Sequence, residues 1–305
     1  MRIPNRVFQC VFLVGLVAFL ALVPTARGDT AYITGGNNIY AWNTTTNTIS
    51  LVTTAPAALD SLIFDTHGNI IYSIIATDQL GVYNPNTNSN SILATVGAGA
   101  ADMTLEPGGN SVLVSDAFST TIDRVNLTTK AVTSLNVHAR PDGLAYDSNG
   151  DLFAVLGLTE VAQLNPATGA ILKTISTPNQ PDGLTFDAMT GKLYVGSDGG
   201  GFYTLPTDLS SATFTRVNGD VIDGVASNGN TLYLIQRGAD GLQYDLTSNT
   251  LTATSPAISS ADDIAPLAGL GSPTTTPEPS SLILLGTGLL VLMGSVRRKF
   301  STYFK

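Results

Sequence analysis

Cysteine is almost absent from this sequence, and the single one, Cys10, lies within residues 1–28. Those residues begin with two arginines, continue with an apolar stretch over 7–23 and end with Ala-Arg-Gly. This order is typical of a secretory signal peptide, and we expect cleavage near Gly28; an uncleaved N-terminal anchor is the alternative. The cleaved chain would hold no thiol, which excludes disulfides, thiolate nucleophiles and cysteine metal sites.

Basic residues are also scarce. Between residues 29 and 270 there are seven, against 22 acidic residues, for a net charge of −15. A nucleic-acid partner is therefore disfavoured, because phosphate binding needs a basic surface. Cations or neutral glycans suit such a chain better. Sustained helical periodicity is missing from the same region, which favours an all-β fold.

A repeat of about forty residues fills this region. The stretch PDGLAYDSNGDLFAVLG (141–157) returns as PDGLTFDAMTGKLYVGS (181–197), with looser copies elsewhere. Each unit divides into four short runs of β-branched and aromatic residues, separated by turn residues. Four antiparallel strands per unit predict a β-propeller. The first aspartates of the aligned units are Asp60, Asp102, Asp142, Asp182, Asp223 and Asp263, with Asp262 as the alternative to the last.

The two ends of the region 29–270 each supply part of a unit. Residues 30–54 contain the second, third and fourth runs without a first, whereas residues 261–270 contain only a first run. Together they complete one unit. We therefore expect six blades, closed into a ring by pairing of the N- and C-terminal strands.

The repeats resemble bacterial propellers of the YVTN and NHL type, and more distantly the gluconolactonase and streptogramin-lyase propellers. The stretches PDGLAYDSNGDLFAV and LNPATGAILKTI carry this resemblance, which spans residues 30–270. Many YVTN-type rings have seven blades, whereas six are counted here. Gluconolactonase-like metal sites mix Glu, Asn and Asp, so the uniform aspartates of this chain count against lactonase activity. The shortage of histidine near the channel raises the same objection to lyase activity.

From residue 271 the sequence changes character. Residues 271–280 form a Pro/Thr/Ser linker, and residues 281–305 comprise 16 apolar residues followed by a basic tail. A helix of that length spans about 24 Å, less than the roughly 30 Å hydrocarbon core of a bilayer. We therefore expect a short transmembrane helix whose basic end stays in the cytoplasm.

Pro277, Glu278 and Pro279 precede the apolar segment, and this order of motif, short helix and basic end is similar to the PEP-CTERM sorting signal. The resemblance implies that the three residues are recognised by a membrane-embedded exosortase, after signal peptidase and the secretion machinery have acted. The chain would be anchored transiently in the inner membrane and then reach the cell surface or extracellular matrix. A permanent anchor with a fortuitous motif is the alternative.

The six aligned aspartates should converge at one mouth of the propeller channel, because each inner strand begins there. The loop residues Asp78, Asp116, Asp198 and Asp240 should lie on the same face. A ring of carboxylates would bind a cation, and Ca²⁺ is the natural candidate. The alternative is a turn role, since an aspartate before glycine readily accepts a backbone N–H bond.

Histidine offers little for catalysis, because the region 29–270 has only two. His138 and Arg140 lie close to Asp142 in sequence and could form a mouth site for proton abstraction. A salt-bridged surface loop is the alternative, favoured because no nucleophile motif or metal-ligand spacing supports the site. His67 falls in a turn on the opposite face. Trp42 and Tyr40, Tyr72, Tyr194 and Tyr233 should pack between blades, with carbohydrate stacking as the alternative.

The predicted function is that of an exported surface or matrix propeller acting as a non-catalytic binding or structural module. An exopolysaccharide or a surface protein is the expected partner, and no cofactor is expected apart from the Ca²⁺ alternative. The second interpretation is a lactonase-like hydrolase or a lyase that uses the acidic channel mouth.

Overall fold

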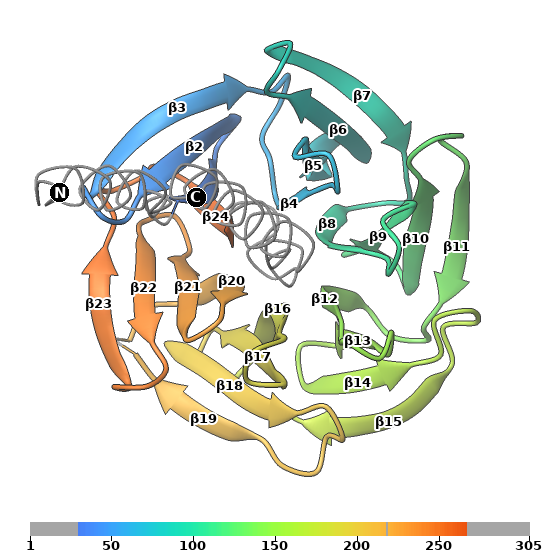
Figure 1. Cartoon of the computed structure of the whole chain (residues 1–305). Coiled ribbons are helices and arrows are strands. Elements are labelled where there is room, and N and C mark those ends of the chain that lie inside the picture. Colours follow the sequence, from blue (N-terminus) through green and yellow to red (C-terminus); the bar gives the residue numbers. More distant parts are fainter. Residues whose placement is uncertain (1–29, 218, 267–305) are drawn as a thin grey trace, which may run out of the picture.

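The structure is a computed structural model that describes residues 30–217 and 219–266. These residues form 24 strands in six four-stranded antiparallel sheets, arranged as blades around a common axis (Figure 1). The predicted all-β, six-bladed propeller is therefore confirmed. No helix in the described part of the chain is long and apolar enough to cross a membrane. The predicted signal peptide (1–28), the linker (271–280) and the sorting helix (281–305) lie outside the described residues.

The blade that joins the two ends of the chain has the strand order β24-β1-β2-β3. Its strands are β24 (Ala261–Pro266), β1 (Thr30–Gly35), β2 (Asn38–Asn43) and β3 (Thr48–Thr54). Tyr32 pairs with Ala265, and Ile33 pairs with Ile264. The last described strand thus supplies the inner strand that the first residues lack, as predicted.

Each of the other five blades runs in chain order from its inner strand to its outer strand. The second blade contains β4 (Leu62–Phe64), β5 (Ile70–Ile74), β6 (Gln79–Asn84) and β7 (Ser89–Thr95), and the third contains β8 (Ala100–Leu105), β9 (Ser111–Asp116), β10 (Thr121–Asn126) and β11 (Val132–Asn136). The fourth contains β12 (Pro141–Tyr146), β13 (Leu152–Leu156), β14 (Glu160–Leu164) and β15 (Ile171–Ser176). The fifth contains β16 (Pro181–Asp187), β17 (Lys192–Ser197), β18 (Gly201–Pro206) and β19 (Thr213–Arg216), and the sixth contains β20 (Ile222–Asn228), β21 (Thr231–Gln236), β22 (Gly241–Asp245) and β23 (Thr250–Thr254).

Asn and Asp side chains build the turns between third and outer strands. The Oδ1 atom of Asn126 accepts backbone N–H bonds from Thr128 at 3.0 Å and Thr129 at 2.7 Å. Asp245 makes the same pair of bonds in the sixth blade. Such side chains replace missing backbone acceptors in a tight turn, which explains their recurrence in the sequence.

The hydrophobic core lies between blades. Six clusters of buried side chains each join two neighbouring sheets. Trp42 of the first blade packs with Tyr233 of the sixth, and both are fully buried. Tyr72 and Tyr194 occupy similar places, so the predicted packing role of these aromatic residues is confirmed. Polar outer strands and buried second strands follow from this arrangement.

The inner strands run from one face of the ring to the other. We call the face where they begin the mouth face; it also holds the loops between second and third strands. The opposite face, the turn face, holds the connections from inner to second strands and from third to outer strands.

Candidate functional site

A β-bulge marks the start of most inner strands. In the fourth blade the pairing passes from Pro141–Leu156 to Leu144–Ala154, so that Asp142 and Gly143 lie in the bulge. The same shift occurs in the third, fifth and sixth blades and in the closing blade. Two successive residues of each blade therefore face the channel mouth.

The strand pairing corrects the predicted alignment of two aspartates. The first mouth position is held by Asp60, Ala101, Asp142, Asp182, Asp223 and Asp262, and the second by Ser61, Asp102, Gly143, Gly183, Gly224 and Asp263. Asp102 and Asp263 are thus one residue later than the other predicted ring members. Aligning the repeats on their aspartates misses this one-residue difference, because the bulge, and not the residue type, fixes which residue occupies each position.

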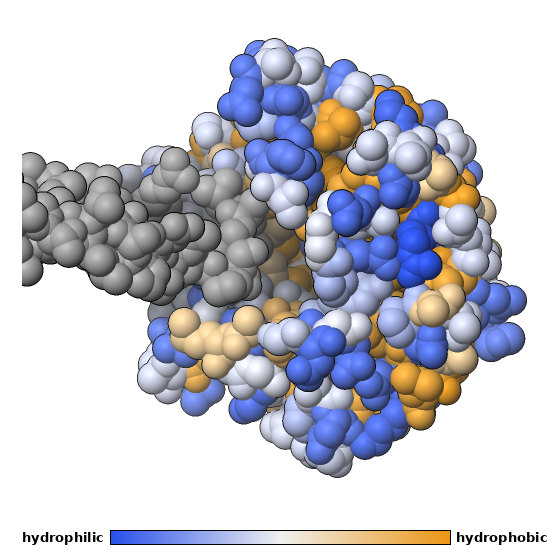
Figure 2. Space-filling model, turned by 45° about the vertical axis from the view of Figure 1, so that its right-hand side comes forward, coloured by the Kyte–Doolittle hydropathy of each residue, from blue (hydrophilic) through white to orange (hydrophobic). Residues whose placement is uncertain are grey.

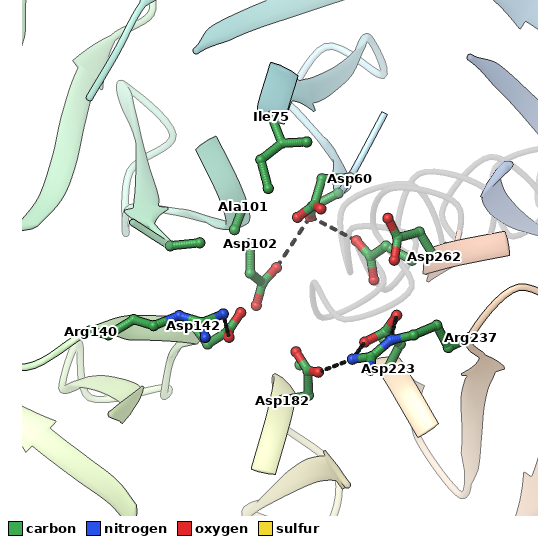
Figure 3. Close-up of a pocket in the computed structure, with 15 residues that line it drawn as sticks. Asp60, Ile75, Ala101, Asp102, Arg140, Asp142, Asp182, Asp223, Arg237 and Asp262 are labelled. Atoms are coloured by element: carbon green, nitrogen blue, oxygen red, sulfur yellow. Dashed lines mark hydrogen bonds and ion pairs between the residues drawn. The ribbon is translucent and has the colours of Figure 1, made fainter. Parts of the chain in front are cut away.

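These residues meet in a cavity of about 210 Å³ at the mouth (Figure 3). All six predicted aspartates line it, and Asp262 joins them as a seventh. Two guanidinium groups, from Arg140 and Arg237, also line the cavity. The predicted convergence of the aspartates is therefore confirmed, and the cavity has an excess of acidic groups.

Asp102 and Asp263 connect neighbouring blades. Asp102 accepts the N–H of Leu144 in the next blade at 2.8 Å, and Asp263 accepts the N–H of Leu62 at 3.0 Å. Ser61 donates its hydroxyl to both carboxyl groups. These bonds are interblade counterparts of the turn role that the sequence suggested for aspartate.

Glycine takes the second mouth position where blades approach more closely. A Cβ atom on Gly143 would lie 2.3 Å from the carbonyl oxygen of Asp182 and 2.6 Å from the nitrogen of Leu184. Gly183 meets the backbone of the sixth blade in the same way. The Asp-Gly pairs of the repeats are therefore needed for contact between inner strands.

Arg237 is the main basic group of the mouth, and it was not among the residues predicted from the sequence. Its Nε donates to Asp223 at 2.8 Å, and its Nη2 donates to Asp182 at 2.7 Å and also to Asp223. Asp198 lies 3.5 Å from the same nitrogen. Sequence could have suggested this residue, because it is the one arginine in a loop between second and third strands within residues 30–217 and 219–266.

The carboxyl groups of the mouth have different pKa values, because burial, mutual repulsion and hydrogen bonds from Arg237 act on them unequally. Burial, with repulsion from Asp142 and Asp263, raises the pKa of Asp60 to about 8. Burial and the neighbouring Asp60 raise the pKa of Asp262 to about 9. Burial would also raise the pKa of Asp223, but the hydrogen bonds from Arg237 hold it below its usual value. Protonated and ionised carboxyls thus coexist at neutral pH.

The loop aspartates lie on the mouth face as predicted, but they have different surroundings. Asp78 accepts the N–H of Gly99 at 2.8 Å. Asp116 is only 1% exposed and bonds Thr121 and Ser119 through one oxygen. Burial raises the pKa of Asp116 to about 6. The backbone carbonyl of Asp240 accepts the N–H of Gln236 at 2.8 Å.

The structure joins only two members of the predicted His138 group. Arg140 and Asp142 form an ion pair at 3.0 Å. His138 is exposed at a positive φ of 64°, and its backbone N–H bonds Asn136. No hydrogen bond within the described ranges links its imidazole to Arg140 or Asp142. His67 lies in the turn between β4 and β5, on the turn face, as predicted.

Residues 30–217 and 219–266 contain no preformed metal site. No group of three or more His, Cys, Asp or Glu side chains there is arranged to hold a metal ion. Asp102 and Asp263 already accept backbone bonds, and Arg237 neutralises Asp223. Calcium at the mouth remains a prediction.

A second cavity, of about 340 Å³, continues the channel toward the turn face. Apolar residues such as Phe64, Leu144, Phe186 and Ile264 line it together with polar backbone and side-chain atoms, and Asp102 and Asp263 lie between the two cavities. The space-filling view shows a central hollow with hydrophobic colour inside it (Figure 2). The channel is therefore strongly polar at the mouth and of mixed character toward the turn face.

Known proteins share a sorting motif and a fold with this chain. Residues 275–299 match the model of the PEP-CTERM protein-sorting motif. The chain carries a PEP-CTERM sorting signal. It includes the predicted Pro277, Glu278 and Pro279, and it implies recognition by an exosortase and an exported, membrane-processed surface protein. No curated protein matches the sequence.

Solved structures similar to this PEP-CTERM chain are propellers of diverse function. A chain of a nidogen/laminin complex aligns with a TM-score of 0.71 at 16% identity, over 79% of this chain and 98% of its own. Virginiamycin B lyase from Staphylococcus aureus aligns with a TM-score of 0.56 at 13% identity, over 76% and 86%. Hydrazine synthase of Kuenenia stuttgartiensis aligns with a TM-score of 0.56 at 12% identity, over 72% and 80%. At such identities the likeness extends to the fold alone.

Proposed function

We propose that this protein is an exosortase-sorted surface or matrix propeller that acts as a non-catalytic binding or structural module. The chain is exported by its signal peptide, anchored transiently in the inner membrane and then released to the cell surface or matrix. The observation that carries this proposal is the sorting motif at residues 275–299, which follows a ring of six blades in the sequence. A rigid ring then presents its loops to a partner.

The use of the mouth carboxyls supports binding rather than catalysis. Asp102 and Asp263 accept backbone bonds between blades, and Asp182 and Asp223 are held by Arg237. Groups with such fixed partners stabilise the ring, and an attacking group would need to be free to reach a substrate. The aspartate repeat is therefore first a structural feature.

An exposed aromatic ring on the mouth face suits a polysaccharide partner. Phe118 is 74% exposed and follows Ala117, which lines the mouth. Its loop bonds the backbone of the loop before β8, and its ring lies against Gly99. A ring held in this way can stack on a sugar while neighbouring carboxyls accept hydroxyl bonds. A surface protein is the other partner considered.

Sorting can be tested on the full chain in cells that contain an exosortase. We expect the secreted form to end near Pro279, as measured by mass spectrometry, and we expect replacement of Glu278 by alanine to hold the chain in the membrane fraction. The matched control is Glu160→Ala, at the start of β14, which should be processed normally. Secretion of Glu278→Ala at the normal rate and length would refute the sorting role.

A hydrolase or lyase is the second candidate, and one observation favours it. Asp262 keeps its proton at neutral pH because burial and Asp60 raise its pKa to about 9, while Asp223 nearby is ionised. A carboxyl that keeps its proton at neutral pH can act as a general acid. Turnover of a lactone or ester that Asp262→Asn abolishes and Asp245→Asn leaves intact would establish this alternative.

The calcium hypothesis rests on the acidic excess of the mouth and has a direct test. Calorimetric titration of the purified chain with calcium would show saturable heat if the mouth takes the ion. Asp142→Asn and Asp262→Asn should then each weaken the uptake, because carboxylates are the ligands that Ca²⁺ prefers. Absence of uptake at millimolar calcium would end the hypothesis.

A further inference from the structure

Both ends of the described propeller lie at the same face. Thr30 begins β1 and Pro266 ends β24, and these strands are antiparallel neighbours in which Ala31 pairs with Pro266. The ends of the two strands are therefore adjacent in space. Because β24 begins at the mouth and runs away from it, both ends belong to the turn face.

The aspartate mouth lies at the opposite end of the same strand. Asp262 and Asp263 follow Ala261, the first residue of β24, and both line the mouth cavity. Six residues of extended chain cover about 20 Å. The point where the chain leaves the ring toward residues 275–299 is thus separated from the mouth by the thickness of the propeller.

Charged side chains are distributed unequally between the two faces. The three lysines of the described residues, Lys130, Lys173 and Lys192, all lie toward the turn face; the ammonium group of Lys173 bonds the carbonyl of Asp208 in a turn-face loop. The mouth face has no lysine among its described loops but does hold Arg140 and Arg237, and the turn face also carries acidic residues, among them Asp65, Asp147 and Asp208. The mouth face carries the mouth carboxyls and the loop residues Asp78, Asp198, Asp220 and Asp240.

We infer that a propeller held at the membrane through its C-terminal segment points its mouth face away from the lipid and its turn face toward it. The inference rests on the proposed membrane stage of sorting. The tether leaves from the turn face. An anionic lipid surface also repels the mouth face more strongly, because acidic residues are more numerous there, whereas three lysines offset part of the acidic charge of the turn face. The surface offered to extracellular partners is then the mouth face, including Phe118.

Energy transfer to the membrane tests this orientation, and the lack of mature cysteines makes labelling simple. In a Cys10→Ser background, Thr120→Cys places one thiol in an exposed mouth-face loop and Ser148→Cys places one in an exposed turn-face loop of the next blade. Each full chain is labelled with a donor dye and reconstituted into vesicles of phosphatidylethanolamine and phosphatidylglycerol that contain a lipid-bound acceptor. Equal thermal midpoints of the two labelled variants serve as the control for folding.

We expect the Ser148→Cys label to transfer energy about two-fold or more better than the Thr120→Cys label, given the roughly 20 Å thickness of the ring. Equal transfer from both labels, or better transfer from Thr120→Cys, would overturn the orientation while leaving membrane anchoring intact. A chain that fails to float with the vesicles would instead refute the membrane stage, and the orientation with it. Added salt should reduce the difference without reversing it, because the tether does not depend on charge.

Discussion

Three carboxyl groups surround the single guanidinium of Arg237. It bonds Asp182 and Asp223, and Asp198 lies 3.5 Å away. These partners come from the fifth and sixth blades, so one side chain neutralises carboxyls of two sheets. Two other carboxyls of the mouth, Asp60 and Asp262, form no ion pair with an arginine within residues 30–217 and 219–266, and burial raises their pKa values to about 8 and 9.

Replacement of Arg237 should therefore destabilise the ring in a pH-dependent way. We expect Arg237→Gln to lower the free energy of unfolding by about 1–2 kcal/mol at pH 7, a range reduced for the 48% exposure of the arginine. The loss should shrink toward pH 3, because Arg237 holds the pKa of Asp223 below its usual value of 3.8 and this carboxylate becomes protonated only in that range. Arg140→Gln, which removes one partner from Asp142 only, is the control and should cost less. An equal loss of unfolding free energy at pH 7 and at pH 3 would contradict the pairing of Arg237 with these carboxylates.

The raised pKa values of Asp60 and Asp262 predict a stability that falls as pH rises. The unfolded chain releases these protons near pH 3.8, whereas the folded chain keeps them until about pH 8 and 9. Between those values the folded state binds more protons, so its stability decreases with pH. We expect the midpoint of thermal unfolding to fall from pH 5 to pH 9.

Asp262→Asn should flatten this dependence, because the amide is neutral at every pH. At pH 8.5 it should raise the midpoint by about 2–4 °C for each kcal/mol of repulsion removed. Asp245→Asn, in a surface turn, is the control and should leave the slope unchanged. A midpoint that rises with pH in the unsubstituted protein would show that the mouth carboxyls are ionised together.

At the scale of the strand, the bulge at the start of most inner strands decides which residues fit at the mouth. Gly143, Gly183 and Gly224 lie where the next inner strand is close, and Asp102 and Asp263 lie where a carboxyl can reach the next blade. Gly143 does not have a positive φ, so contact rather than backbone conformation requires the glycine.

Gly143→Ala should consequently push two blades apart. A Cβ atom there would meet backbone atoms of the fifth blade at 2.3 and 2.6 Å, which no side-chain movement can relieve. We expect a loss of about 1–3 kcal/mol by denaturant unfolding. Gly191→Ala is the control: its Cβ would meet open space, and only its φ of 65° opposes the change. A smaller cost for Gly143→Ala than for this control would refute the contact argument.

Sequence predicted the strands, the turns and the convergence of aspartates because each has a local cause. Period, turn chemistry and strand propensity repeat in every unit, and the mouth follows from where inner strands begin. The positions of Asp102 and Asp263 in their bulges were not predictable. An alignment of the aspartates shifts these two units by one residue, and only the strand pairing reveals the shift. Arg237 was missed because its partner Asp182 lies 55 residues away in the sequence.

At the scale of the whole molecule, buried clusters distribute stability around the ring. Each of the six clusters joins two blades, so every blade depends on both neighbours. The contacts of β24 differ from the others because they connect three blades instead of two. Ile264 packs with Trp42 and Tyr233, and Asp263 bonds the second blade, so a strand from the end of the chain connects the first, second and sixth blades.

Removal of β24 should therefore open the ring. A chain ending at Ser260 loses the strand paired with β1, the bonds of Asp263 to Ser61 and Leu62, and the buried Ile264. A chain ending at Leu270 keeps all of these and is the matched control. We expect the shorter chain to lose its cooperative thermal transition and to be cut rapidly by protease in the first and sixth blades, because an open ring exposes unpaired strand edges and apolar surface. A shorter chain with the same transition midpoint as the control would mean that five complete blades and a three-stranded remnant are stable without closure.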